Sequence, residues 1–191
     1  KTLEEKNLIK NLKLKDEVAF KYLVENYKDF VFNTCISIIQ NVDDSDDISQ
    51  EVFIQVYKSI KNFKEKSSLS TWIYKITVSK CFEYLRFKKR KKRFSLLVNL
   101  FRDDGTIIDI PEFEHPGIIL EKKENSKLLF NAIDKLNEEQ KTAYILKNIQ
   151  GLSYKKIAEI MNKSTSSIES LIFRAKKNLK LHLTKKMDNK K

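Results

Sequence analysis

Residues 151–165 of this 191-residue chain read GLSYKKIAEIMNKST. Ser153 is a good helix N-cap, because a serine oxygen accepts a hydrogen bond from an unpaired N–H group of the first turn. The apolar residues behind it recur at the three- and four-residue steps of a helix, at Ile157, Ala158 and Met161. Asn162 tolerates the left-handed conformation in which many helices end. The stretch therefore predicts a short helix followed by a tight turn at residues 161–163.

A second helix is expected directly after this turn, capped by Ser164 or Thr165. Its apolar side is formed by Ile168, Leu171, Ile172 and Ala175. Its exposed side offers Ser166, Ser167, Glu169, Ser170, Phe173, Arg174, Lys176 and Lys177. Such a pair has a helix-turn-helix layout, in which the second helix fits the major groove of duplex DNA. An ordinary helical hairpin with a basic surface would show the same pattern.

The rest of the chain also favours helices. Three glycines and two prolines are too few for a strand-and-turn protein, and a hydrophobic content of 41% provides for a core. Apolar periodicity predicts helices over residues 16–40, 43–60, 70–93, 118–136 and 138–149. Ser70 is the expected N-cap of the third, and Gly151 is expected to follow the end of the last. We therefore expect an all-α fold.

Charge is segregated along the chain, beneath a net charge of +12. Residues 61–93 carry 12 basic and 2 acidic side chains, and residues 163–191 carry 9 and 2, whereas residues 1–60 carry 8 and 11. Two basic blocks on a helical protein indicate contacts with a phosphate backbone. The first block is interleaved with aromatic residues. A contact with nucleic acid therefore explains it better than a basic face that only keeps the protein solvated.

The composition changes between the two basic blocks. Residues 94–124 carry 3 basic and 7 acidic side chains, together with both prolines and two of the three glycines. This is the composition of a linker. We therefore expect one domain over residues 1–93, an acidic linker over 94–124, a second domain over 125–184 and a basic tail over 185–191.

Little in the sequence indicates an enzyme active site or a metal site. The glycines are not clustered as a phosphate-binding loop requires, and the two histidines lie far from both cysteines. Cys35 and Cys81 fall within apolar helical patterns and are expected to be small core residues rather than nucleophiles. No cofactor, metal site, export signal or membrane-spanning segment is expected. Free thiols point to a reducing, cytoplasmic location.

Three further stretches carry a resemblance to a known family. Residues 46–57 read DDISQEVFIQVY, residues 68–76 read SLSTWIYKI, and residues 136–140 read LNEEQ ahead of the helix pair at 151–179. The first resembles conserved region two of bacterial sigma factors, and the second the segment that follows it in the extracytoplasmic-function (ECF) subfamily. The third, together with the helix pair, resembles region four. Order and spacing agree over about residues 15–93 and 125–183.

The resemblance implies two small helical domains, a region two bundle and a region four helix-turn-helix, joined by an acidic flexible linker. It implies a transcription initiation subunit, not an enzyme, with core RNA polymerase and promoter DNA as partners. An anti-sigma factor is a further partner that this subfamily allows. The helix that carries Asp47, Gln50, Glu51 and Ile54 is similar to the one that docks on the clamp helices of the polymerase β′ subunit, and the β subunit is a further contact. For Asp46 and Asp47, helix capping is the alternative role.

The basic block at 61–93 is similar to the element that captures the melted minus-ten promoter strand. The residues that fit this role are Lys64, Lys66, Lys80, Tyr84, Arg86, Phe87, Lys88 and Lys89. Ser79 and Glu83 depart from the residues that the family often carries there, so an altered minus-ten sequence is expected.

The last helix resembles the reader of the minus-thirty-five element through its exposed residues named above. Glu169 and Leu171 stand where many members carry basic residues, so weaker or altered binding is expected.

Two other functions stay open at this point. A stand-alone helix-turn-helix regulator would bind duplex DNA without polymerase, but it leaves residues 46–57 unexplained. A partner-binding adaptor that has lost DNA binding would show no salt-dependent affinity for DNA.

Overall fold

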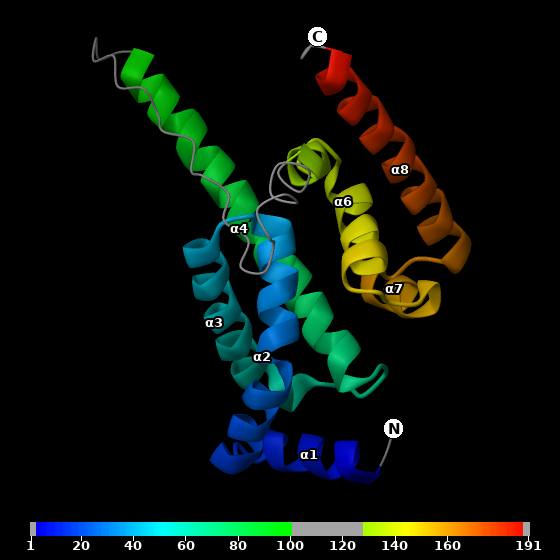
Figure 1. Ribbon diagram of the computed structural model, residues 1–191. Coiled ribbons are helices and arrows are strands. Elements are labelled where there is room, and N and C mark those ends of the chain that lie inside the picture. Colours follow the sequence, from blue (N-terminus) through cyan, green and yellow to red (C-terminus); the bar gives the residue numbers. More distant parts are fainter. Residues whose placement is uncertain (1–2, 101–127, 189–191) are drawn as a thin grey trace.

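The computed structural model describes residues 3–100 and 128–188, and every regular element within these two stretches is helical, which confirms the all-α expectation. The elements are α1 Leu3–Lys13, α2 Glu17–Ile39, α3 Val42–Ser59, the short 3-10 helix η1 Ile60–Asn62, α4 Leu69–Leu100, a helix over 128–133, α6 Glu138–Tyr144, the π-helical turn η2 Ile145–Ile149, α7 Tyr154–Met161 and α8 Thr165–Asp188 (Figure 1). Most of the predicted linker (101–124), the start of the helix predicted from 118 and the last three residues of the predicted tail lie outside the described residues.

The N-terminal half is a bundle in which α2, α3 and α4 pack against one another (Figure 1). Its centre is filled by side chains that are fully buried, among them Leu23, Val31, Cys35, Val52, Val56, Ile73 and Cys81. Helix α1 crosses one end of the bundle and buries Ile9 and Leu12 against it. Helix α1 was not predicted from the sequence, because its frequent charges obscure the two buried residues.

Helix starts differ in detail from the predicted ones. Asn41 caps α3, accepting a hydrogen bond from the Asp44 N–H at 2.8 Å, which excludes the alternative role of Asp46 and Asp47 as caps. Ser68, and not Ser70, caps α4: its Oγ accepts from the Thr71 N–H at 3.2 Å. Helix α4 also continues past Arg93 to Leu100.

The C-terminal half contains the predicted helix-turn-helix. Ser153 caps α7, and Asn162 ends it in the left-handed conformation with φ 52°. Ser164 caps α8, because its Oγ accepts from the Ser167 N–H at 3.2 Å. Gly151 follows the π-helical turn at φ +68°. Ile157, Ala158, Ile168, Leu171 and Ile172 form the core that holds the two helices together.

The two halves are packed on each other along α2 and α4. Tyr74 of α4 is 6% exposed and belongs to the apolar cluster of the C-terminal half, beside Ala143 and Leu146. Gln40 Nε2 donates to Asp134 Oδ1 at 2.8 Å, and Lys156 Nζ donates to Ser70 Oγ at 3.1 Å. No helix within residues 3–100 or 128–188 is long and apolar enough to cross a membrane.

Candidate nucleic-acid interface

Helix α3 presents the four residues predicted for polymerase docking on one exposed face. They stand at positions i, i+3, i+4 and i+7, which share one side of a helix: Asp47, Gln50, Glu51 and Ile54. All four are exposed, and Ile54 exposes 52% of its surface. The opposite side of α3 packs into the bundle through Ile48, Val52 and Val56. The bundle therefore fixes the helix and leaves this acidic face open.

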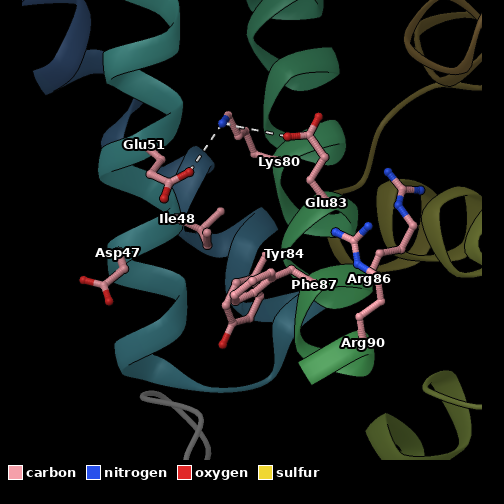
Figure 2. A pocket seen from close by; sticks show the side chains of 9 residues that line it. All are labelled: Asp47, Ile48, Glu51, Lys80, Glu83, Tyr84, Arg86, Phe87 and Arg90. Atoms are coloured by element: carbon pink, nitrogen blue, oxygen red, sulfur yellow. Dashed lines mark hydrogen bonds and ion pairs between the residues drawn. The ribbon is translucent and has the colours of Figure 1, made fainter. Parts of the chain in front are cut away.

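Four of the residues predicted for the minus-ten element line a groove between α3 and α4. The groove has a volume of about 540 Å³ and is lined by Asp47, Ile48, Glu51, Lys80, Glu83, Tyr84, Arg86, Phe87 and Arg90 (Figure 2). It therefore brings two predicted docking residues, Asp47 and Glu51, together with Lys80, Tyr84, Arg86 and Phe87. Phe87 is 55% exposed, a high value for a phenylalanine. The groove thus combines opposite charges with an accessible aromatic ring.

An ion pair joins the two helices across this groove. Lys80 Nζ lies 3.4 Å from Glu51 Oε2 of α3 and 3.8 Å from Glu83 Oε2 of its own helix (Figure 2). The lysine side chain is 25% exposed, whereas both glutamates are more than half exposed. Pairing at this exposure contributes little to stability, so the groups remain available to another partner.

A second pair lies further along the same two helices. Lys88 Nζ donates to Asp44 Oδ2 at 2.7 Å, and Tyr84 shares this contact. Partial burial opposes the charged carboxylate, but the hydrogen bonds from Lys88 and Tyr84 and the lysine charge outweigh it and lower the pKa of Asp44. Partial burial likewise opposes the ammonium, yet Asp44 and Tyr84 raise the pKa of Lys88. The pair is therefore fully charged near neutral pH.

The other four predicted minus-ten residues do not line the groove. Lys88 pairs with Asp44 as described, and Lys89 lines a cavity beside Asp134 and Lys141 of the C-terminal half. Arg86 lines the groove and also reaches the C-terminal half, because its Nη1 lies 3.0 Å from Glu138 Oε2. The loop lysines Lys64 and Lys66 are exposed and do not line the groove. The structure thus brings half of the predicted minus-ten set together and leaves the other half apart.

Helix α8 carries the residues predicted for the minus-thirty-five element on its outer face. Ser167 is half-buried. The other seven are exposed: Ser166, Glu169, Ser170, Phe173, Arg174, Lys176 and Lys177. Phe173 exposes 70% of its surface, and Arg174 Nε donates to the Ser170 carbonyl at 3.2 Å. Together with Glu169 these residues border a shallow depression.

Leu171 is buried, as its predicted place on the apolar side of the helix requires: its side chain is 4% exposed and lies in the core of the C-terminal half. The expectation that a basic residue at this position would reach phosphate is therefore wrong. The place of Leu171 in the helical period, between Ile168 and Ala175, explains this burial. Of Glu169 and Leu171, only Glu169 lies on the exposed face.

Five residues of the groove and its pairs were not among the predicted site residues: Ile48, Glu83, Arg90, Asp44 and Glu138. Arg90 was detectable, because it stands four positions after Arg86 on the same helix. Asp44 and Glu138 come from other elements, and no spacing along the chain links them to Lys88 and Arg86. Within the described residues no cluster of three or more His, Cys, Asp or Glu side chains is arranged to hold a metal ion.

Comparison with known proteins identifies the family. The model for sigma-70 region 2 matches residues 23–91, and the model for sigma-70 region 4 matches residues 126–179. The ECF RNA polymerase sigma-E factor of Haemophilus influenzae is 30% identical over 178 residues, which cover 91% of this chain and 92% of that protein. The ECF RNA polymerase sigma factor SigW of Bacillus subtilis is 30% identical over 93% of this chain and 96% of its own length.

A solved structure shares the fold. The sigma factor RpoE of Bartonella quintana, crystallised with the anti-sigma factor NepR, superposes with a TM-score of 0.63 at 21% identity, over 86% of this chain and 96% of that one. The matches to both regions, and the 30% identity to these relatives over nearly the full length of the chain, agree with the helix-turn-helix and the acidic α3 face. The chain belongs to the ECF family of RNA polymerase sigma factors.

Proposed function

We propose that this chain docks on core RNA polymerase through α3, reads the minus-thirty-five element as duplex DNA through α8, and binds the minus-ten element as melted single strand through α4. The observation that carries the proposal is the groove in which the acidic α3 face adjoins the basic and aromatic residues of α4. No catalytic step is assigned to the chain, because the polymerase performs nucleotidyl transfer. It would act in the cytoplasm, where the polymerase is.

Docking is proposed for Asp47, Gln50, Glu51 and Ile54. Two carboxylates beside a half-exposed isoleucine suit a protein surface that is basic at its rim and apolar at its centre. The same acidic face would repel DNA phosphates, so it favours a protein partner. The clamp helices of the β′ subunit, with a further contact on the β subunit, are the proposed partner surface.

Capture of the minus-ten strand is proposed for Lys80, Tyr84, Phe87 and Lys88, with Arg86, Lys89 and the loop lysines Lys64 and Lys66 as outer contacts. Single strands are bound by cations along the backbone and by aromatic faces on which bases stack. Stacking contributes about 1–3 kcal/mol per base, comparable with the cost of unstacking it. The exposed ring of Phe87 next to Tyr84 supports this role.

Reading of duplex DNA is proposed for the outer face of α8. Arg174 is the residue of choice for the two acceptors of a guanine, and Glu169 can accept a hydrogen bond from a cytosine amino group. Lys176 and Lys177 would neutralise phosphates. Ser166, Ser167, Ser170 and Phe173 complete the face, with Phe173 placed for apolar contact with a thymine methyl group.

The domain limits 1–93 and 125–184, the acidic linker 94–124 and the basic tail belong to the same proposal. The linker would lie in the channel of the polymerase, where its negative charge resembles that of RNA. An anti-sigma factor is a further proposed partner, since the RpoE structure of similar fold holds one.

The experiment adds the purified chain to bacterial core polymerase with a pool of promoter fragments. Specific initiation is expected, and Gln50→Ala/Glu51→Ala should abolish it while duplex binding stays intact. The matched control is Glu25→Ala/Asn26→Ala, which removes one carboxylate and one amide from the exposed side of α2. Initiation that survives the α3 double variant would overturn the docking assignment. Salt-sensitive duplex binding without initiation would identify a stand-alone regulator instead.

A further inference from the structure

Two thiols meet in the centre of the N-terminal bundle. Cys35 of α2 and Cys81 of α4 are 46 positions apart in sequence, and their sulfur atoms are 3.6 Å apart. Both side chains are fully buried, and neither is joined to another group covalently. A disulfide needs a sulfur–sulfur distance of about 2.05 Å, so the two atoms must approach by about 1.5 Å before the bond can form.

Polar contacts surround the two thiols. Two cysteines that only filled space in the core would not need such contacts. The Cys81 thiol donates to the Cys35 sulfur, and this contact, together with the Ser49 hydroxyl of α3, outweighs burial and lowers the pKa of Cys35. The same contact and burial raise the pKa of Cys81 well above its ordinary value. Cys35 is therefore the thiol that becomes the thiolate, and the thiolate is the form that reacts with oxidants.

A buried ammonium from the other half of the molecule acts on Cys81. Lys141 of α6 is 5% exposed, its Nζ is bound to the Asp134 carboxylate, and its charge favours the thiolate form at Cys81. Negative charge that develops on the Cys81 sulfur during a reaction is stabilised by this ammonium.

We propose that Cys35 and Cys81 form an oxidant-responsive dithiol that hydrogen peroxide converts into an intramolecular disulfide. Peroxide is the chemical class that fits, because a molecule little larger than water can reach a buried sulfur during brief openings of the bundle. The inference is independent of the promoter-reading function.

The reaction has two steps. The Cys35 thiolate attacks one peroxide oxygen, the O–O bond breaks, and the released hydroxide takes up a proton, which leaves a sulfenic acid and one water. The Cys81 sulfur then attacks the Cys35 sulfur, the S–O bond breaks, and the leaving hydroxide takes the Cys81 proton as a second water. The two thiols lose two electrons, and one peroxide is reduced to two waters.

The bond would enclose the whole of α3 in a covalent loop. It would also fix α2 to α4, the helix that carries Lys80, Tyr84 and the interdomain residue Tyr74. Oxidation therefore acts on the element that joins the groove to the C-terminal half.

In the test, the full-length chain is kept folded and reduced, and hydrogen peroxide is added. The dose is one that is sufficient to oxidise dithiothreitol completely. The sample is then quenched, denatured and alkylated. We expect both thiols to disappear together, the intact mass to fall by two hydrogen atoms, the chain to stay monomeric, and dithiothreitol to restore both thiols. Cys35→Ala and Cys81→Ala should give no such product, and circular dichroism checks that each is folded. Thiols that remain titratable, cross-linked dimers alone, or a gain of two oxygen atoms without a bridge would each overturn the proposal.

A second pair of variants separates the reactive dithiol from an incidental contact. Lys141→Met keeps the length and burial of the side chain but removes its charge, and it should slow disulfide formation several-fold. Lys135→Met removes an exposed lysine from the same half of the molecule and should leave the rate unchanged. Equal rates in the wild type and both variants would overturn the role given to Lys141.

Discussion

The ammonium of Lys80 lies between two carboxylates that belong to different helices, 3.4 Å from Glu51 of α3 and 3.8 Å from Glu83 of α4. The contact links the helix proposed to dock on polymerase to the helix proposed to capture the melted strand. Because both glutamates are largely exposed, the pair is solvated and exchangeable. A DNA phosphate can therefore replace either carboxylate at small cost.

Lys80→Met tests this assignment. Its free energy of unfolding should stay within about 1 kcal/mol of the wild type, because an exposed ion pair contributes no more than that. Affinity of the polymerase complex for a minus-ten single strand should fall, and the slope of log affinity against log salt should become shallower by about 0.7. Fluorescence anisotropy over a salt series measures both quantities. Lys21→Met, on the exposed side of α2, is the control, and an unchanged slope in Lys80→Met would remove Lys80 from the strand-binding set.

The pair of Asp44 and Lys88 predicts a pH dependence of stability. The lowered pKa of Asp44 means that its contribution is present above the ordinary carboxyl pKa of about 3.9 and is lost as pH falls through the lowered folded value. The raised pKa of Lys88 means that its contribution is present below the ordinary lysine pKa of about 10.4 and is lost as pH rises through the raised folded value.

Asp44→Asn should therefore be less stable than the wild type between these limits, by less than about 1 kcal/mol because both side chains are partly solvated. The difference should shrink below pH 4, as the wild-type carboxylate also becomes neutral. Urea denaturation at pH 7 and pH 3 measures it. A difference that is the same at both values would show that the aspartate acts through something other than its charge.

The outer face of α8 predicts two distinct losses. Arg174→Ala should cost about 1–3 kcal/mol of duplex affinity at one base-pair position and relax the sequence preference there. Lys176→Ala should weaken all duplexes alike and make the salt slope shallower by about 0.9. Binding to a library of minus-thirty-five variants at two salt concentrations separates the two effects. If both variants lose affinity uniformly, Arg174 contacts phosphate rather than a base.

The sequence alone predicted the positions of most helices, because apolar periodicity and capping residues are local signals. Ser153, Asn162 and Gly151 all adopt the expected roles in the C-terminal half. The caps of α3 and α4 were misplaced because Asn41 and Ser68 compete with several equally good polar residues nearby, and only the packed bundle decides between them.

The exposed faces that carry the candidate site were predictable from the sequence, but the contacts between them were not. The exposed faces of α3 and α8 follow from helical spacing, whereas the pairs Lys80–Glu51, Lys88–Asp44 and Arg86–Glu138 join separate helices. Which residues meet there depends on how the helices cross. The approach of Cys35 to Cys81 and the burial of Lys141 are hidden from sequence for the same reason.

Gly151 gives a prediction about local strain. Its φ of +68° is in the left-handed region, and a Cβ added there would meet no atom within 4 Å. Gly151→Ala should therefore destabilise the chain by about 1–2 kcal/mol through backbone strain alone, with no steric clash. Urea denaturation measures the loss, and Gly151→Asn should recover part of it, because asparagine tolerates this conformation. Equal losses in the two variants would point to a cause other than backbone strain.

Tyr74 predicts how strongly the two halves of the molecule unfold together. Its ring packs 4.3 Å, centroid to centroid, from Phe30 of α2 and also lies in the apolar cluster of the C-terminal half. Tyr74→Ala should lower the free energy of unfolding by about 3–5 kcal/mol, as loss of a buried aromatic ring does, whereas Tyr74→Phe keeps the ring and should change it little.

The same variant should separate the unfolding of the two halves. Trp72 is the single tryptophan and packs on Phe63 in the N-terminal bundle, so its fluorescence follows that half, while far-ultraviolet circular dichroism follows all helices. Fluorescence and dichroism should give one transition in the wild type and in Tyr74→Phe, and two separated transitions in Tyr74→Ala. Coincident transitions in the alanine variant would mean that contacts such as Gln40–Asp134 and Arg86–Glu138 suffice to couple the halves. Two separated transitions would assign the coupling to the Tyr74 ring, which packs on Phe30 of the N-terminal bundle and belongs to the apolar cluster of the C-terminal half.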